Sequence, residues 1–321
     1  MRRQSRSAGG TSDLLGQSFR DYSIYGISIR SHFPIAHCDA VARPRAPRVI
    51  IAKSRVPLAA GEWGPEPWFT QKLLPDGSVY LRWSGLFEFL ISANGRRISS
   101  RELKDSTPEA FSTYLLGQVL SFGLVKQGLE SLHASAIVVD GGSIGFLGDC
   151  GQGKSTLLAS FLQEGLKQLT DDLLLVRRKR DLIISYPGPL RIKLLPASAF
   201  LLGKQAQGVA MNPLVPKMVI PVAAKKFQRT PVPLKALYLL AQGGSSQRIR
   251  ITAIPHAKAL LGLVTNSFNI SLKDPPRLER QFRWATEIVS SIPVRQISYP
   301  RNYDALPAVR AAILNQFSLD N

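Results

Sequence analysis

An eight-residue run from Gly148 to Ser155 has the composition and spacing of a loop that binds phosphate. It reads Gly-Asp-Cys-Gly-Gln-Gly-Lys-Ser and matches the pattern G-x-x-x-x-G-K-[ST] at every fixed position. The glycines let the backbone curl so that successive N–H groups point at phosphate oxygens, and a following helix presents its positive end to them. We therefore expect a nucleoside triphosphate site that includes Gly148, Asp149, Cys150, Gly151, Gln152, Gly153, Lys154, Ser155 and Thr156.

Two side chains of this run carry chemistry of their own. In such a loop the lysine, here Lys154, reaches the β- and γ-phosphates, and the hydroxyl of Ser155 ligates Mg²⁺. ATP and Mg²⁺ are therefore the expected cofactors. The alternative is a glycine-rich turn with an incidental lysine. We favour the phosphate loop because the apolar run 144–147 precedes it and a predicted helix, Lys154–Gln163, follows it.

Two adjacent carboxylates, Asp171 and Asp172, directly precede the apolar run 173–176. Carboxylates beside an apolar strand are costly unless they pair with a cation or a metal. Neighbouring residues on a strand point to opposite faces, so one aspartate can meet Mg²⁺ while the other faces a substrate. A turn with two solvated aspartates is the alternative, and the preceding phosphate loop favours the functional interpretation.

His133 lies at the entry of a predicted strand, one hairpin before the phosphate loop, in the run Leu-His-Ala-Ser. A histidine at a strand end is usually structural, but this one is close enough in sequence to serve the phosphates. The residues alone leave both interpretations open.

The elements around these residues fall into two groups. Residues 22–99 predict a small antiparallel sheet with strands at 22–30, 49–52, 78–83 and 87–92, turns at Asp76-Gly77 and Asn94-Gly95, and a loop at 57–67. Pro108 then opens an amphipathic helix that continues to Lys126 and stops at Gly128. Beyond it we expect strands at 136–139, 144–147, 173–176, 182–186, 236–240 and 249–254, and helices at Lys154–Gln163, from 257 to 263 and at 305–317.

This pattern predicts three parts. Residues 1–16 form a disordered basic tail without the apolar stretch of a secretory signal, 17–105 a small β-rich N-terminal domain, and 106–321 an α/β catalytic domain with a P-loop. The chain has two cysteines, Cys38 and Cys150, which favours a reducing cytoplasm over a disulfide framework and gives no zinc site. The sequence contains no run of eighteen or more apolar residues, so no transmembrane helix is expected.

The net charge of +19 favours acidic partners. The charge is scattered over the chain, and no motif that reads RNA or DNA accompanies it. A solvated basic surface is therefore the preferred interpretation, and no dedicated nucleic-acid site is expected. The residues of this expected basic surface include Arg43, Arg45, Arg48, the run 177–180, Lys225 and Lys226.

Taken together, the run 132–136, the loop 148–156 and the run Leu-Thr-Asp-Asp at 169–172 resemble the catalytic domain of HPr kinase/phosphorylase. The resemblance is specific over about residues 128–176. It implies a mixed sheet around the phosphate loop, similar to the phosphoenolpyruvate carboxykinase core, and an ATP-dependent serine kinase that can form oligomers. It also implies roles: Asp171 as general base, Asp172 and Ser155 as Mg²⁺ ligands, Lys154 neutralising the transferring phosphoryl group, and His133 supporting Asp171 or the phosphates.

The chain departs from that family after the aspartates. The Arg-Gly-Leu-Gly signature is missing, residues 186–193 read Tyr-Pro-Gly-Pro-Leu-Arg-Ile-Lys instead, and a further metal-binding glutamate has no counterpart. The run Tyr-Gly-Ile-Ser-Ile at 25–29, the long helix from Pro108, the phosphate-loop motif and the segment 187–196 give a second resemblance, which covers more of the chain. It is to HPr-kinase-like bacterial proteins that include lasso-peptide precursor serine kinases. It implies a protein or peptide acceptor with a serine. In that case Arg191, Lys193 or Lys217 could contact a second phosphate or the peptide, but a surface charge is the preferred interpretation of each. A nucleotide-binding regulatory protein with little catalysis and a small-molecule kinase stay open as alternatives.

Overall fold

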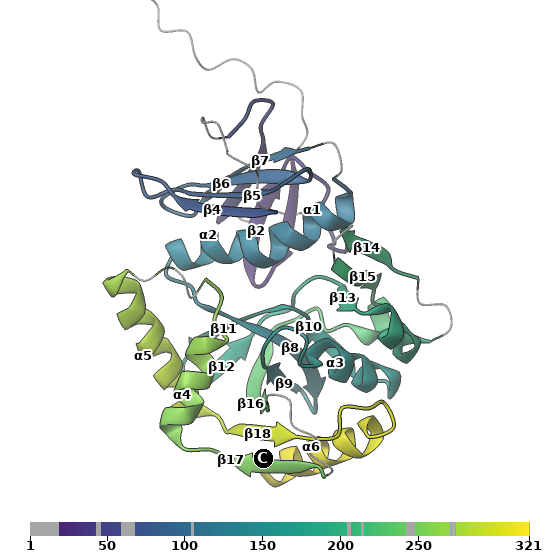
Figure 1. The fold of residues 1–321 in the computed structure, drawn as a ribbon. Helices are drawn as coiled ribbons and strands as arrows, with labels where there is room; N and C mark the ends of the chain where they lie inside the picture. Colours follow the sequence, from purple (N-terminus) through teal and green to yellow (C-terminus); the bar gives the residue numbers. More distant parts are fainter. Residues whose placement is uncertain are drawn as a thin grey trace, which may run out of the picture.

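The computed structural model describes residues 19–42, 46–58, 68–103, 106–203, 207–212, 215–241, 248–269, 272 and 274–320. The expected tail at 1–16, most of the expected loop at 57–67, and the charged residues Arg43 and Arg45 lie outside these residues. Within them the fold is mixed α/β, with several sheets and an N-terminal β region (Figure 1).

The N-terminal sheet has seven strands within the described residues, in the order β1-β2-β3-β7-β6-β5-β4. Both predicted turns are confirmed, since Gly77 and Gly95 each adopt a positive φ between paired strands. The strands are β1 (Arg20–Ile24), β2 (Ile27–Ser31), β3 (Val49–Lys53), β4 (Phe69–Leu73), β5 (Val79–Trp83), β6 (Phe87–Ile91) and β7 (Arg97–Glu102).

Two expectations for this sheet are wrong. The sheet is mixed, because β3 runs parallel to both β2 and β7. Parallel neighbours cannot be joined by a hairpin, and long segments of chain connect β3 to each of them. The single strand expected at 22–30 is a hairpin, because Tyr25 and Gly26 both adopt a positive φ between β1 and β2. A Cβ on Gly26 would lie 2.1 Å from the ring of Tyr186, so only glycine allows this turn to pack against the following part of the chain.

The predicted helix at 108–126 forms three consecutive segments: α1 (Pro108–Tyr114), the π-helix η1 (Leu115–Val119) and α2 (Leu120–Lys126). Thr107 caps its start by accepting a hydrogen bond from the Ala110 amide. The helix lies between the N-terminal sheet and the remainder of the molecule (Figure 1). Its apolar side shares one core with the sheet and with Leu173 and Leu175, so the boundary expected at residue 105 separates this sheet from the helix that covers it. The division into domains stays a prediction.

The second sheet has eight strands within the described residues, in the order β10-β8-β11-β12-β16-β18-β17, with β9 between β8 and β16. Strand β9 runs parallel to β16, which runs parallel to β18, so these three form the parallel part. The bounds are β8 (Ser131–Val139), β9 (Gly142–Leu147), β10 (Lys167–Thr170), β11 (Leu173–Lys179), β12 (Leu182–Ser185), β16 (Val232–Leu240), β17 (Arg250–Ala253) and β18 (Val294–Ser298).

Helices cover both faces of this sheet. Alternating side chains of β9 enter different cores: Phe146 packs with α3 (Lys154–Gln163) and α6 (Leu306–Asp320), whereas Leu147 packs with α4 (His256–Thr265) and α5 (Pro275–Ser291). A small third sheet lies beside α1 (Figure 1). Its strands are β13 (Arg191–Leu194), β15 (Val215–Pro221) and β14 (Val209–Asn212), and the short helices η2 (Pro196–Leu202) and η3 (Ala224–Lys226) flank them.

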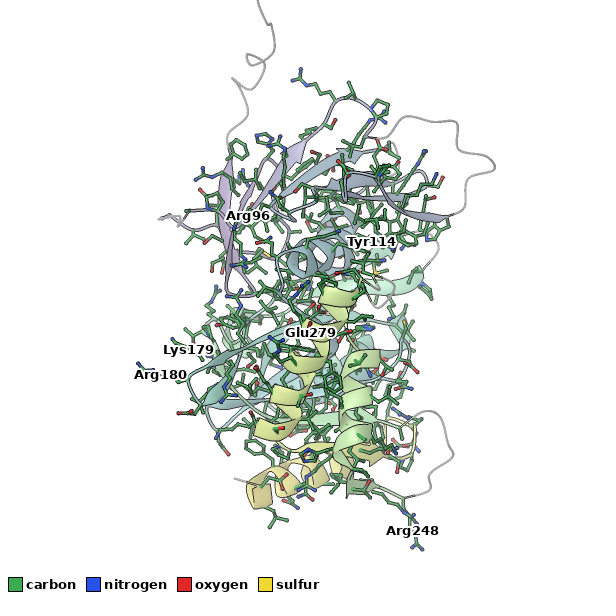
Figure 2. The ribbon with its side chains drawn as sticks, turned by 90° about the vertical axis from the view of Figure 1, so that its left-hand side faces the viewer. Arg96, Tyr114, Lys179, Arg180, Arg248 and Glu279 are labelled. Carbon is green, nitrogen blue, oxygen red and sulfur yellow. The ribbon has the colours of Figure 1, made fainter. Side chains whose placement is uncertain are left out.

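Helix α5 and strands β4, β7, β10, β13, β14, β15 and β18 were not expected from the sequence. The buried face of α5 begins with Arg277 and Gln281, so no apolar stripe marks its first two turns. No helix in the described part of the chain is long and apolar enough to cross a membrane. Lys179 and Arg180 are exposed and point outward at the turn between β11 and β12 (Figure 2).

A buried ion pair attaches α5 to the start of β8. The Arg277 side chain is 0% exposed and donates to both carboxylate oxygens of Glu130, at 3.1 and 3.0 Å, while Glu130 is 3% exposed. The same guanidinium also donates to the carbonyl oxygens of Phe268, Asn269 and Leu272. Such a pair is costly to break, because removing one partner leaves an uncompensated charge in the interior.

We predict that Glu130→Ala lowers the free energy of unfolding by about 3–5 kcal/mol, because Arg277 is left buried and unpaired. Urea unfolding followed by circular dichroism measures this loss. Glu279→Ala is the matched control, since Glu279 pairs with Arg283 on the exposed side of the same helix and should change stability little (Figure 2). Equal losses in the two variants would contradict the prediction.

Candidate functional site

The predicted loop joins the end of β9 to the start of α3, as the sequence pattern requires. Gly148, Gly151 and Gly153 all have positive φ angles, of 153°, 86° and 85°. At Gly148 a Cβ would lie 2.2 Å from the Gln152 Oε1, which itself accepts a hydrogen bond from the Asp149 amide. The glycines therefore permit both the curl and the close approach of the Gln152 side chain.

Lys154 folds back over this loop at the first position of α3. Its Nζ donates to the carbonyl oxygens of Gly148 at 2.5 Å and Asp149 at 3.1 Å. Burial lowers the pKa of the ammonium, and the nearby charges of Asp171 and Asp172 oppose that shift. The ammonium thus sits at the centre of the loop, with two carboxylates close enough to act on it.

Asp171 connects the loop to the neighbouring strands. The residue is 4% exposed, and its Oδ1 accepts hydrogen bonds from the hydroxyls of Ser155 at 2.9 Å and Ser135 at 2.6 Å. Its Oδ2 accepts a hydrogen bond from the Lys193 amide at 2.9 Å. Three donors from α3, β8 and β13 therefore hold this carboxylate in one orientation.

Asp172 has different partners. The Lys193 Nζ lies 2.7 Å from its Oδ1, and the Nε2 of His133 lies 3.6 Å from the same atom. Burial alone would raise the pKa of Asp172, but the charge and hydrogen bond of Lys193 outweigh it and hold the pKa well below the usual range. Asp172 is therefore ionised and already paired with a cation.

The expectation that the two aspartates point to opposite faces of a strand is wrong. They lie in the bend between β10 and β11, where Asp172 adopts a φ of 85° that interrupts the alternation of a strand. Both border one small cavity of about 70 Å³, together with the predicted residues His133, Lys154 and Ser155. The fold thus brings the loop, the aspartate pair and the histidine together.

Lysines from the third sheet complete this cavity. Lys193 of β13 and Lys217 of β15 both line it, and the Nζ of Lys217 is 3.8 Å from the Sγ of Cys150. Arg191 does not line the cavity. It is buried and donates to the hydroxyl of Thr113. The sequence analysis named Lys193 and Lys217 but did not place them in the site, and it gave Ser135 no role. Nothing in the spacing of these three residues indicates that they approach the loop.

The π-helical segment η1 packs against the Asp172 side chain through Gly117. A Cβ added to Gly117 would lie 2.8 Å from the Asp172 Oδ2, closer than side chains normally approach. The extra residue in a π-turn shifts the helix face, and such turns often occur at functional sites. Gly117 therefore leaves just enough room for the carboxylate to reach Lys193.

Burial lowers the pKa of His133 to about 4, and the charges of Lys154 and Lys193 add to the effect while Asp172 opposes it. The side chain is 33% exposed. His133 is therefore neutral at neutral pH. It can accept or donate a hydrogen bond beside Asp172, but it adds no positive charge to the cavity.

No protein-family model matches the chain, and no curated protein matches it in sequence. Solved structures resemble it in part. One is the Hpr(Ser) kinase/phosphatase from Coxiella burnetii, with a TM-score of 0.31 and 12% sequence identity, over 60% of this chain and 99% of that chain. A likeness at that level carries no inference about this site, so the function proposed below rests on the geometry already described.

We predict that His133 makes the protein less stable as the pH falls from 6.5 towards 4. In that window the unfolded chain binds a proton at His133 that the folded protein does not yet bind, so stability that is present above pH 6.5 is lost. In His133→Gln the urea midpoint should fall less over this window than in the unaltered protein.

His256→Gln is the control, since His256 is exposed at the start of α4. That variant should follow the unaltered protein. Parallel curves for the unaltered protein and His133→Gln would show that His133 does not titrate as the burial requires.

Proposed function

We propose that the chain is an ATP-dependent phosphotransferase, in which the 148–155 loop is a P-loop that binds the triphosphate and a serine hydroxyl of a protein or peptide accepts the γ-phosphate. The observation that carries this proposal is the hydrogen bond of 2.9 Å from the Ser155 hydroxyl to the Asp171 carboxylate. In P-loop enzymes the loop hydroxyl and an acidic residue on a nearby strand hold the same Mg²⁺. A glycine-rich turn without function would not require that pairing.

The loop residues supply binding and charge neutralisation. Its amides and the start of α3 would contact the phosphates, and Lys154 would leave the carbonyls of Gly148 and Asp149 for the β- and γ-phosphates. Moving this ammonium costs little, because its present partners are two neutral carbonyls and the phosphates offer full charges.

The site has oxygen donors that suit Mg²⁺, namely the hydroxyl of Ser155 and the two carboxylates. The described residues contain no group of three or more His, Cys, Asp or Glu side chains placed to hold a metal ion. The Ser155 hydroxyl and the two carboxylates nevertheless fit Mg²⁺, because this ion is commonly held by one or two carboxylates together with substrate phosphates. When bound, the ion would neutralise charge on the β- and γ-phosphates.

The contacts favour an exchange of the two roles that the sequence resemblance implied. Asp171 contacts Ser155 and is the better candidate for the metal side of the site. Asp172 lies beside His133 and Lys193, and is the better candidate for the acceptor side. In this proposal Asp171 and Ser155 hold Mg²⁺, and Asp172 meets the incoming hydroxyl.

The transfer step then has a defined place for every group. The acceptor oxygen forms a bond to the γ-phosphorus, the bond from that phosphorus to the β,γ-bridging oxygen breaks, and ADP leaves with the negative charge. The hydroxyl proton passes to the carboxylate of Asp172. A carboxylate paired with Lys193 is a weak base, so orientation and charge neutralisation by Lys154 would supply most of the rate.

The acceptor side of the cavity is basic, because Lys193 and Lys217 line it. We propose a protein or peptide substrate in which the serine has acidic neighbours, since the excess of positive charge would attract it. Cytoplasmic location is part of the same proposal, because a chain with two cysteines favours a reducing compartment. Assembly into homo-oligomers is also part of it, because the family resemblance implies it.

A nucleotide-binding protein without transfer activity is the second candidate. It is favoured by the ion pair between Asp172 and Lys193, which already satisfies the carboxylate that would receive the proton. Tight binding of ATP without phosphate transfer to any serine peptide would select this candidate.

We predict that Asp171→Asn and Asp172→Asn affect different steps. Asp171→Asn should weaken the stimulation of ATP binding by Mg²⁺, because it removes a negative charge beside Ser155. Asp172→Asn should bind MgATP normally and lose phosphate transfer by about 10²-fold or more. Calorimetry with and without Mg²⁺, and transfer of labelled phosphate to a serine peptide panel, measure the two effects.

Two lysine variants control this experiment. Lys154→Met should weaken ATP binding by more than about tenfold, whereas Lys167→Met, at the exposed first position of β10, should not change it. Loss of Mg²⁺ dependence in Asp172→Asn rather than in Asp171→Asn would restore the original assignment of roles. Normal ATP binding by Lys154→Met would refute the P-loop.

We predict that Gly117→Ala lowers phosphate transfer by about tenfold with little change in ATP binding, because the new methyl group displaces the Asp172 carboxylate. Gly123→Ala is the control in the same helix, since its Cβ would face the Gly95 carbonyl, away from the cavity. The ratio of transfer rate to ATP affinity separates the two variants. An equal effect of both would mean that the helix acts through stability alone.

A further inference from the structure

A second and larger cavity opens beside the 148–155 loop. It has a volume of about 460 Å³, against about 70 Å³ for the cavity with the two aspartates. The two cavities share Gly151, Gly153, Thr156 and Leu195 in their walls. Any group bound across the loop therefore has one end near the aspartates and the other end in this larger cavity.

The larger cavity has the lining of a small-molecule site. Its walls include the rings of Tyr299 and Tyr303 and the apolar side chains of Leu195 and Leu306, with Ser198 and Arg301 among its polar groups. Mostly apolar walls with a few fixed polar groups, in a volume between about 300 and 1,000 Å³, are typical of pockets for small ligands. Within the described residues no carboxylate lines it.

Its two principal side chains are held in position. The hydroxyl of Tyr303 lies 3.0 Å from the Ser198 Oγ, and the rings of Tyr303 and Phe200 pack in a T-shaped arrangement with their centroids 5.0 Å apart. Arg301 lies over the ring of Tyr299 at 4.4 Å and donates to the carbonyls of Gln152 and Ala241. Tyr303 is 40% exposed, so part of its side chain is open to a ligand although these contacts hold it in place.

We propose that this cavity binds the nucleoside of the bound triphosphate, with the base stacked on Tyr303 and the guanidinium of Arg301 beside it. The inference rests on the proposed P-loop. With the γ-phosphate at the aspartates, the nucleoside must leave the loop on the other side, and the smaller, charged cavity has no room for it. An aromatic face and a planar guanidinium are the groups on which bases stack.

The test compares ATP with Mg²⁺-tripolyphosphate, which has the phosphates and lacks the nucleoside. Calorimetry gives the dissociation constant of each for the unaltered protein and for Tyr303→Ala, Tyr303→Phe and Phe282→Ala. Phe282, an exposed aromatic residue on α5, is the matched control for removing a ring.

In Tyr303→Ala the dissociation constant for ATP should rise roughly tenfold, because one stacking partner is lost. The constant for tripolyphosphate should stay within about twofold. Tyr303→Phe keeps the ring and should retain most of the ATP affinity, and Phe282→Ala should match the unaltered protein for both ligands.

Three results would overturn the proposal. Equal affinity of the unaltered protein for ATP and tripolyphosphate would show that the nucleoside is not bound, and the P-loop would stand. Equal weakening of both ligands in Tyr303→Ala would show that the ring supports the loop and not the base. Failure of the unaltered protein to bind either ligand would refute the P-loop itself, and with it this inference.

Discussion

The hydrogen bond between Ser155 and Asp171 joins the two segments on which the site depends. Ser155 belongs to the first turn of α3, and Asp171 to the bend between β10 and β11. A buried carboxylate tolerates this position only because Ser135 and the Lys193 amide also donate to it. Strand β8, the helix after the loop and the third sheet must therefore all be in place before the loop and the aspartates can face one another.

The N-terminal sheet contributes to the same geometry without entering the cavity. The long helix that covers this sheet carries Gly117, which packs against Asp172. The turn at Tyr25 and Gly26 packs on Tyr186 and donates from the Tyr25 amide to the Pro187 carbonyl, close to the segment that leads to Lys193. A part of the chain with no visible chemistry in its sequence thus sets the position of one charged pair in the site.

The two cavities on either side of the 148–155 loop differ in the charges that line them. On the aspartate side, Lys154, Lys193 and Lys217 face Asp171 and Asp172 in a small space, where charges act strongly on one another. On the other side the cavity is larger, aromatic and free of carboxylates within the described residues. This division suits a ligand with a charged end and a neutral, planar end, which is the chemical form of a nucleoside triphosphate.

Local patterns in the sequence predicted much of the fold around the loop. The strand before the loop, helix α3, the hairpin turns at Gly77 and Gly95 and the long helix from Pro108 were all predicted from apolar spacing, glycines and prolines. Each of these signals acts over a few residues, so it can be read without knowing the fold. Helix α5 was not predicted, because its buried face begins with Arg277 and Gln281. Such polar side chains can be buried only where partners from elsewhere in the chain, such as Glu130, contact them.

The sequence by itself determined the loop, since its glycines, lysine and serine are contiguous and their spacing alone defines the curl and the helix that follows. The tertiary structure decided which aspartate meets Ser155, the pairing of Asp172 with Lys193, and the aromatic cavity beside Tyr303. Those contacts join residues that are 16, 21 and about 150 positions apart along the chain. Such distances are closed by β-pairing and core packing, which no local pattern of residues records.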